Sequence, residues 1–406
     1  MNEKIDSNVS RRDFVRALGL MGVGSVVGAG SALAQPAAPA EATPAAAKPA
    51  KVPTRPFGKT GVQVSMLGLG GIFDTISNQL VLKQAMDWGV TYWDTAEGYG
   101  NGNSEKGMGM FLEKNPQARK DMFLVTKSHG GNMTDALNKS LERLKTDYVD
   151  AYFMHGDTGG FSAETKAWVE KAKVDKKIRF FGFSTHSNMA KNLQDAAKAG
   201  WIDCIMLKYD YSLMQTDDMK AAMDAATKAG IGLTAMKTQL RGSIKTETDA
   251  DLKMGGHFIK RGFTQEQAKL KILWDNPQLS CICSQMPSVT ILQANIAAAL
   301  DKTTLTAQDH RIMREYAEAT RSLRCAGCTQ FCQTAPGHEA PIGDVMRCLM
   351  YHRSYGDQEL ARTVFRQLPE AARRGLAGFD YAAAERACPH GLPIAQLMRE
   401  ANALFA

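Results

Sequence analysis

The chain lacks concentrated positive charge and a long apolar run, the features typical of nucleic-acid-binding and membrane proteins. Its formal net charge over 406 residues is only +7, and lysines and arginines are mixed with acidic residues rather than gathered in one segment. The apolar run at residues 17–33 is short and rich in glycine for a membrane span. We therefore expect no nucleic-acid binding and no stable membrane span after removal of the first residues.

The N-terminus has the pattern of an export signal. Arg11 and Arg12 precede the apolar run, and Ala32-Leu33-Ala34 offers a cleavage site of small residues. This arrangement is typical of a twin-arginine signal over residues 1–34, with a membrane anchor as the alternative. It predicts export to the periplasm by the twin-arginine machinery. As a class, this route resembles one for proteins that are already folded, often with a cofactor inserted. Residues 35–53, rich in alanine and proline, predict a flexible linker.

The rest of the chain has ordinary globular composition, with 44% hydrophobic and 22% charged residues. Strand patterns alternate with helical ones, which indicates a parallel sheet, closed here because the strands number eight. The expected strands are residues 66–71, 91–93, 122–127, 148–155, 178–184, 204–208, 232–236 and 280–285. We predict an α/β fold: a (β/α)₈ TIM barrel at 54–304, followed by a small helical cysteine-containing domain at 305–406. Helices at 343–355 and 358–367 are expected to pack against the barrel.

Polar residues follow three successive strands of this expected barrel. Asp94 and Tyr99 come at and just after the end of the second strand, Lys127 ends the third, and His155 ends the fourth. In a parallel barrel these strand ends converge on one face, where active sites form. The sequence therefore predicts that these side chains meet at the mouth of the barrel.

Together these residue types predict acid–base chemistry. The unperturbed pKa of a phenol is about 10, too high for an efficient acid near neutrality. We expect the Lys127 cation to lower the pKa of Tyr99, and Asp94 to pair with Lys127 and hold it in place. His155 would orient a carbonyl oxygen or relay a proton. Such a set can protonate a carbonyl oxygen as hydride reaches its carbon.

Asp94-Thr95-Ala96 with Tyr99-Gly100, Lys127 and His155 resemble the catalytic tetrad of the aldo/keto reductase family. Further resemblance lies in Arg55-Pro56-Phe57-Gly58-Lys59-Thr60-Gly61, in the segment from Arg143 to Asp150 and in Ile178-Arg179-Phe180-Phe181-Gly182-Phe183-Ser184. The ordered set runs from about residue 55 to 299. The resemblance implies a (β/α)₈ barrel with Tyr99 as general acid/base, a nicotinamide cofactor, NAD(P), and a small carbonyl or alcohol substrate.

The cofactor side of the resemblance has departures. The positions that it assigns to the cofactor are Ser184, Thr185, Met206, Met236, Lys237 and Asn295. Met206 stands where a glutamine is expected, and Met236 where many members stack an aromatic ring. No cation stands near Pro287, where members that select the 2′-phosphate carry one, so NAD and NADP both stay open. A barrel that has lost dinucleotide binding is the alternative.

The cysteines after residue 304 predict a metallocentre. Cys325, Cys328 and Cys332 are followed much later by Cys388-Pro389, and three clustered cysteines with a remote Cys-Pro are typical of iron–sulfur ligation. The region resembles the ferredoxin-like extension on one branch of the family, here with ligands for one 4Fe–4S cluster. Zinc and disulfides are the alternatives. The remaining thiols are expected in the core; they are Cys204, Cys281, Cys283 and Cys348.

These features predict an exported oxidoreductase that reduces a carbonyl or oxidises an alcohol. The alternative is an iron–sulfur electron-transfer or redox-sensing protein that uses the barrel as a scaffold and passes single electrons to a periplasmic partner.

Overall fold

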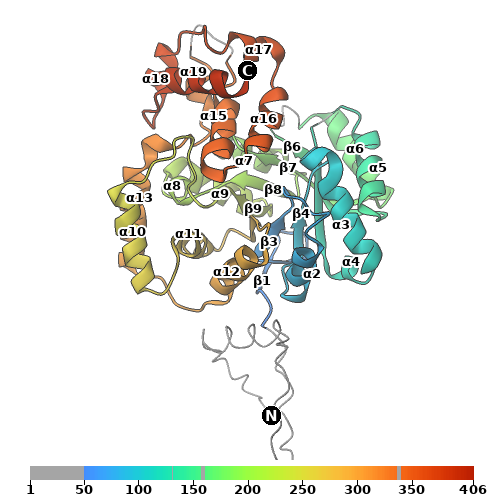
Figure 1. Cartoon of the computed structure of the whole chain (residues 1–406). Coiled ribbons are helices and arrows are strands. Elements are labelled where there is room, and N and C mark those ends of the chain that lie inside the picture. Colours follow the sequence, from blue (N-terminus) through green and yellow to red (C-terminus); the bar gives the residue numbers. More distant parts are fainter. Residues whose placement is uncertain (1–49, 130, 157–160, 336–339) are drawn as a thin grey trace, which may run out of the picture. The chain divides into compact units, whose positions relative to one another are not determined.

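Eight parallel strands close into a barrel in the order β10-β3-β4-β5-β6-β7-β8-β9 (Figure 1). The structure, a computed structural model, describes residues 50–129, 131–156, 161–335 and 340–406, so the predicted signal at 1–34 and most of the linker at 35–53 lie outside the described residues. The barrel strands are β3 (Leu67–Gly70), β4 (Tyr92–Asp94), β5 (Phe123–Ser128), β6 (Val149–His155), β7 (Ile178–Thr185), β8 (Cys204–Lys208), β9 (Gly232–Met236) and β10 (Cys281–Gln285).

The prediction of a (β/α)₈ barrel is confirmed, with each expected strand found at its place in the chain. The strands are buried almost throughout, because helices cover their outer face and side chains fill the inside. Cys204, Cys281 and Cys283 lie in this interior, as expected. Met206 and Met236 pack there too.

A two-stranded antiparallel hairpin, absent from the prediction, closes the N-terminal end of the barrel. It consists of β1 (Thr54–Pro56) and β2 (Gln63–Ser65). Phe57, which follows β1 and is fully buried, meets the rings of Tyr92 and Phe123 edge-on, with ring centres 6.1 and 5.1 Å away. A side chain at Gly232 would collide with Phe57, since its Cβ would lie 2.7 Å from the ring. The Arg-Pro-Phe-Gly motif thus plugs the barrel.

Helices surround the barrel and then continue beyond it (Figure 1). Those up to residue 319 are α2 (Gln79–Asp87), η1 (Tyr99–Gly102), α3 (Asn103–Lys114), α4 (Ala118–Asp121), α5 (Met133–Leu144), α6 (Ala163–Val174), α7 (Met189–Ala199), α8 (Tyr211–Met214), α9 (Asp217–Lys228), α10 (Asp249–Lys260), α11 (Gln265–Trp274), α12 (Val289–Leu300) and α13 (Ala307–Ala319). The capping box that starts α13 joins Thr306 and Asp309, as the sequence indicates.

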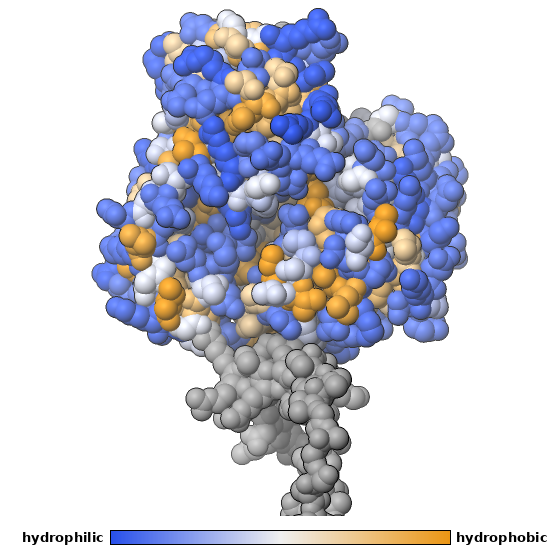
Figure 2. All heavy atoms as spheres, in the orientation of Figure 1, coloured by the Kyte–Doolittle hydropathy of each residue, from blue (hydrophilic) through white to orange (hydrophobic). Residues whose placement is uncertain are grey.

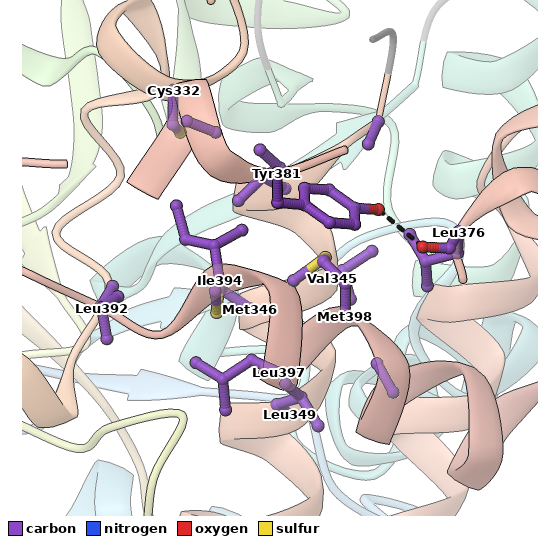
Figure 3. Packing of buried hydrophobic residues seen from close by; sticks show 14 of the residues in the cluster. Cys332, Val345, Met346, Leu349, Leu376, Tyr381, Leu392, Ile394, Leu397 and Met398 are labelled. Atoms are coloured by element: carbon purple, nitrogen blue, oxygen red, sulfur yellow. Dashed lines mark hydrogen bonds between the residues drawn. The ribbon is translucent and has the colours of Figure 1, made fainter. Parts of the chain in front are cut away.

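Residues 320–406, here called the extension, form a helical region with its own core. Its elements are η2 (Arg321–Leu323), α14 (Thr329–Cys332), α15 (Ile342–Met350), η3 (Tyr351–Tyr355), α16 (Gln358–Arg366), α17 (Glu370–Gly375), α18 (Ala382–Ala387) and α19 (Ile394–Phe405). Val345, Leu349, Leu397 and Met398 fill this core, and Cys332 lies at its edge (Figure 3). Cys348 is fully buried in the same core, which confirms its assignment.

The visible face of the molecule is mostly hydrophilic, with apolar residues in separate patches (Figure 2). None of the helices within the described ranges has the length and apolar character needed to cross a bilayer.

The extension is joined by hydrogen bonds to loops at the C-terminal end of the barrel. Ser243, on the loop after β9, donates through Oγ to the carbonyl of Met346 at 2.8 Å. The backbone N–H of Asn188, after β7, donates to the carbonyl of Gly327 at 2.8 Å. Lys208, the last residue of β8, donates to the carbonyl of Cys325. The extension therefore covers the ends of β7, β8 and β9.

Candidate active site and thiol cavity

The structure brings Asp94, Tyr99, Lys127 and His155 together at the C-terminal end of β4, β5 and β6. Lys127 Nζ lies 2.7 Å from both carboxylate oxygens of Asp94 and donates to the carbonyl of Thr95 at 2.7 Å. It also donates to Tyr99 Oη at 3.4 Å. The ring centres of Tyr99 and His155 are 5.6 Å apart, edge to face. These side chains thus lie together, as expected from the sequence. Their catalytic roles stay a prediction.

The loop that carries Tyr99 is held by an ion pair from the Arg143 motif. Arg143 Nη1 donates to the carbonyl of Glu97 at 3.2 Å and to Oε2 of the fully buried Glu105 at 3.1 Å. Gly102, with φ of +88°, lies against this guanidinium, and a Cβ there would come within 2.4 Å of Arg143 Cζ. Arg143 therefore holds the loop that carries Tyr99 in position.

The expectation that Lys127 lowers the pKa of Tyr99 is wrong. Burial, followed by the nearby Asp94 carboxylate, raises the pKa of Tyr99 well above its ordinary value. A carboxylate beside the phenol disfavours the phenolate. Asp94 is also among the groups nearest to the Lys127 ammonium, so its negative charge offsets the effect of that cation on Tyr99. Tyr99 is therefore a neutral phenol across the physiological range, the form that can donate a proton.

His155 is kept neutral as well. Burial, and then the cation Lys127, hold the pKa of His155 well below its ordinary value. Its ring stacks on that of His129 with centres 4.2 Å apart. His155 Nδ1 is buried with no hydrogen-bond partner among the described residues, so it is free to contact a bound molecule.

This assembly of an acid, a cation and a phenol at a barrel mouth can be compared with known proteins. The sequence pattern of the Aldo/keto reductase family matches residues 67–316. The chain belongs to the aldo/keto reductase family. As such it is an oxidoreductase, and its match to the family ends at Tyr316, before the extension.

Individual relatives of this aldo/keto reductase agree with the family assignment. L-galactose dehydrogenase of Arabidopsis thaliana is 23% identical over 285 residues, which cover 62% of this chain and 89% of the plant protein. An aldo-keto reductase from Klebsiella pneumoniae, solved in complex with NADPH, is 25% identical with a TM-score of 0.53 and coverage of 65% of this chain and 94% of its own. A thermostable aldo-keto reductase solved with the inhibitor epalrestat has 25% identity, a TM-score of 0.55 and coverage of 65% and 99%.

The residues that the family resemblance assigns to the cofactor follow one arc of the barrel. Ser184 and Thr185 end β7, Met206 lies in β8, Met236 ends β9 with Lys237 directly after it, and Asn295 lies on α12 beside β10. These four strands are consecutive neighbours in the barrel.

Not every member of this arc points to a ligand. Ser184 Oγ is buried with no hydrogen-bond partner in the described part of the chain, so it fits a polar group such as a carboxamide. Asn295 Nδ2 instead donates to Ser284 Oγ at 3.1 Å. Met206 and Met236 pack in the barrel interior. The nicotinamide end of a dinucleotide therefore has a fitting partner in this aldo/keto reductase at Ser184.

The sequence did not lead us to expect that the extension places a charged residue, Arg347, beside this arc. The helix at 343–355 was expected only to pack, and its Val345 and Met346 do so. Arg347, which follows them, points to the barrel instead and donates through Nη1 to His186 Nδ1 at 3.2 Å. Its charge opposes the rise in the pKa of Tyr99. The available signal was a lone cation within an apolar helical stretch.

The four predicted ligand cysteines line one cavity in the extension, with about 320 Å³ of space not filled by atoms, open solvent included; they are Cys325, Cys328, Cys332 and Cys388. All eight cysteines are free thiols, so none of these four is used in a disulfide. Burial and then the charges of neighbouring cysteines raise the pKa of Cys328 to about 11 and that of Cys332 to about 12. Within the described residues, no group of three or more His, Cys, Asp or Glu side chains could hold a single metal ion. The thiols thus face a common hollow rather than one point.

Proposed function

We propose that this protein reduces a carbonyl compound, or oxidises the corresponding alcohol, with a nicotinamide cofactor as the hydride carrier. The observation that supports the proposal most is the buried contact of Lys127 with Asp94 and Tyr99 at the barrel mouth. When bound, the cofactor supplies or accepts the hydride. The Klebsiella pneumoniae relative was solved in complex with NADPH.

In the proposed reaction each side chain of the tetrad has its own task. Tyr99, a neutral phenol, donates its proton to the carbonyl oxygen as negative charge develops there. Lys127 lies 3.4 Å from Tyr99 Oη and stabilises the phenolate that remains. Asp94 holds the lysine in place. Neutral His155 orients the substrate oxygen, and Ser184 Oγ holds the carboxamide of the cofactor.

Replacement of Tyr99 by phenylalanine tests this role. We expect Tyr99→Phe to lower kcat for reduction of a small aldehyde by about 10²–10⁴-fold, the usual contribution of a positioned acid. The matched control is Tyr209→Phe, which removes another buried phenol, one that accepts from Asn276 Nδ2 at 3.1 Å. Equal activities of wild type and Tyr99→Phe across a panel of aldehydes and ketones would refute the proposal.

We further propose that the thiol cavity holds one 4Fe–4S cluster, with Cys325, Cys328, Cys332 and Cys388 as its ligands. A cube of four irons separates its thiolates more widely than one zinc ion does, and this suits four thiols around a hollow. Cationic metal would also offset the burial that disfavours these thiolates. Export to the periplasm by the twin-arginine route is proposed with it, because that route carries folded proteins with their cofactors.

Iron analysis of purified protein tests the cluster. We expect Cys328→Ala to lose iron, acid-labile sulfide and visible absorbance after anaerobic purification. Cys348→Ala is the matched control, since Cys348 is buried in the same extension but does not line the cavity. Zinc without sulfide, or metal retained by Cys328→Ala, would contradict the assignment. If the cluster is present but Tyr99→Phe is as active as wild type, an electron-transfer protein becomes the better description.

A further inference from the structure

A second cavity lies where the extension meets the ends of β7, β8 and β9. It contains about 360 Å³ of space not filled by atoms. Its lining includes Lys208 at the end of β8, Lys237 and Arg241 after β9, and Arg347 of α15. Within the described chain no carboxylate lines it. The cavity is therefore surrounded by positive charge on both the barrel side and the extension side.

These cations have mostly neutral partners. Lys208 and Arg241 each donate to a backbone carbonyl of the extension. Lys237 Nζ faces two tyrosine rings, with centres 4.4 and 5.0 Å away. Arg347 pairs with Asp344 at 2.9 Å, and no other of the four has a carboxylate partner in the part of the chain that is described. Like charges around a shared, poorly solvated space repel one another, and an anion between them would offset that repulsion.

Unused hydrogen-bond donors point to the same ligand chemistry. The Nε atoms of Arg241 and Arg347 and Nε2 of His186 are buried without a hydrogen-bond partner among the described residues. Because Arg347 donates to His186 Nδ1, the neutral ring of His186 carries its proton on Nε2. Burial and then Arg347 hold the pKa of His186 well below its ordinary value, so this ring is neutral. The cavity thus offers donors that lack acceptors, and an anionic oxygen group supplies acceptors.

We propose that this cavity binds an anionic oxygen group and that Arg347, which lies outside the region matched by the family, is the residue that holds it. The group is either a carboxylate of the carbonyl substrate or a phosphate of the cofactor. Arg347 is within electrostatic reach of Tyr99, since its charge opposes the rise in the pKa of that phenol, and a carboxylate bound to Arg347 would therefore leave the carbonyl of the same molecule on the side of Tyr99. The identity of the anion rests on the proposed function, but the anion site does not.

Binding without turnover tests the site itself. Inorganic pyrophosphate and oxalate are titrated calorimetrically into the full-length protein, into Arg347→Gln and into Arg353→Gln. Arg353 is a matched control because its side chain is 23% exposed against 22% for Arg347, it pairs with Glu400, and it does not line the cavity. We expect Arg347→Gln to weaken binding by about 10–100-fold, as for loss of a hydrogen bond to a charged group, and Arg353→Gln to leave binding unchanged. No binding by wild type, or equal loss in both variants, would overturn the proposal.

Kinetics then separate the two sources of the anion. If the anion is the carboxylate of the substrate, Arg347→Gln raises KM for succinic semialdehyde but not for butanal, and the Kd of NADPH is unchanged. If it is a phosphate of the cofactor, the Kd of NADPH rises and the two aldehydes are affected equally. If Arg347→Gln causes neither change while turnover stays intact, both assignments of the anion are refuted and the proposed function still stands. Pyrophosphate binding that depends on Arg347, without turnover of any aldehyde, refutes the proposed function alone.

Discussion

Removal of the Lys127 ammonium tests the electrostatics of the barrel mouth most directly. The side chains of Lys127 and Asp94 are 1% and 4% exposed, and both carboxylate oxygens lie 2.7 Å from the ammonium. Lys127→Met leaves a carboxylate buried without its countercharge. Breaking a buried pair from one side costs about 3–5 kcal/mol, and we expect the free energy of unfolding to fall by that amount at pH 8.

The loss depends on pH in a direction that follows from Asp94. Burial already raises the pKa of Asp94, although Lys127 opposes the rise. Without Lys127 the pKa rises further. A carboxyl group with a raised pKa in the folded state contributes stability that is complete below its unfolded pKa of about 3.9 and is lost as pH rises through the folded value. The deficit of Lys127→Met is therefore smaller at pH 5 than at pH 8.

Urea unfolding followed by tryptophan fluorescence at both pH values measures this deficit. Lys171→Met is the surface control, because Lys171 is 75% exposed and pairs with an exposed Asp175; we expect it to cost less than about 1 kcal/mol. The double variant Asp94→Leu/Lys127→Met should regain most of the loss, since it removes the unpaired charge. A deficit below about 1 kcal/mol, or one that is equal at both pH values, would refute the reasoning.

Three further results are expected from the same geometry. Because the pKa of Tyr99 is raised well above the ordinary phenol value of about 10 and that of His155 is lowered, kcat for reduction should stay level from pH 6 to about pH 10; a break near pH 7 in a stopped-flow profile would contradict this. Phe57→Ala should lower the free energy of unfolding in urea by about 3–5 kcal/mol, since it leaves a cavity at the N-terminal end of the barrel. A loss below about 1 kcal/mol would show that the Phe57 ring does not stabilise the barrel. Arg143→Leu should lower kcat more than it raises KM, because it frees the Tyr99 loop and leaves the buried Glu105 unpaired; a change in KM alone would argue against this positioning role.

Much of the barrel could be predicted from the sequence because its signals are local. Buried strands such as Val149–His155 are short segments made mostly of apolar and aromatic residues, and their alternation with helices identifies a parallel barrel. The hairpin that includes Thr54–Pro56 was not predicted, since three-residue strands give too little pattern.

The tetrad could be predicted because parallel strand ends converge, whatever the details of the loops. The pKa of Tyr99 could not, because it depends on burial and on Asp94 in three dimensions. Arg347 was missed for a similar reason. It is 192 positions or more from every member of the tetrad, and only the packing of α15 brings its charge to the barrel mouth.

The plug formed by Phe57 determines from which end a small molecule can approach the barrel. With its ring seated against Tyr92 and Phe123, the N-terminal end is sealed by aromatic carbon, and the interior beyond it is filled by side chains. A small molecule that contacts the side chains at the barrel mouth therefore approaches from the opposite end, which α15 partly covers through its contacts with Ser243 and His186.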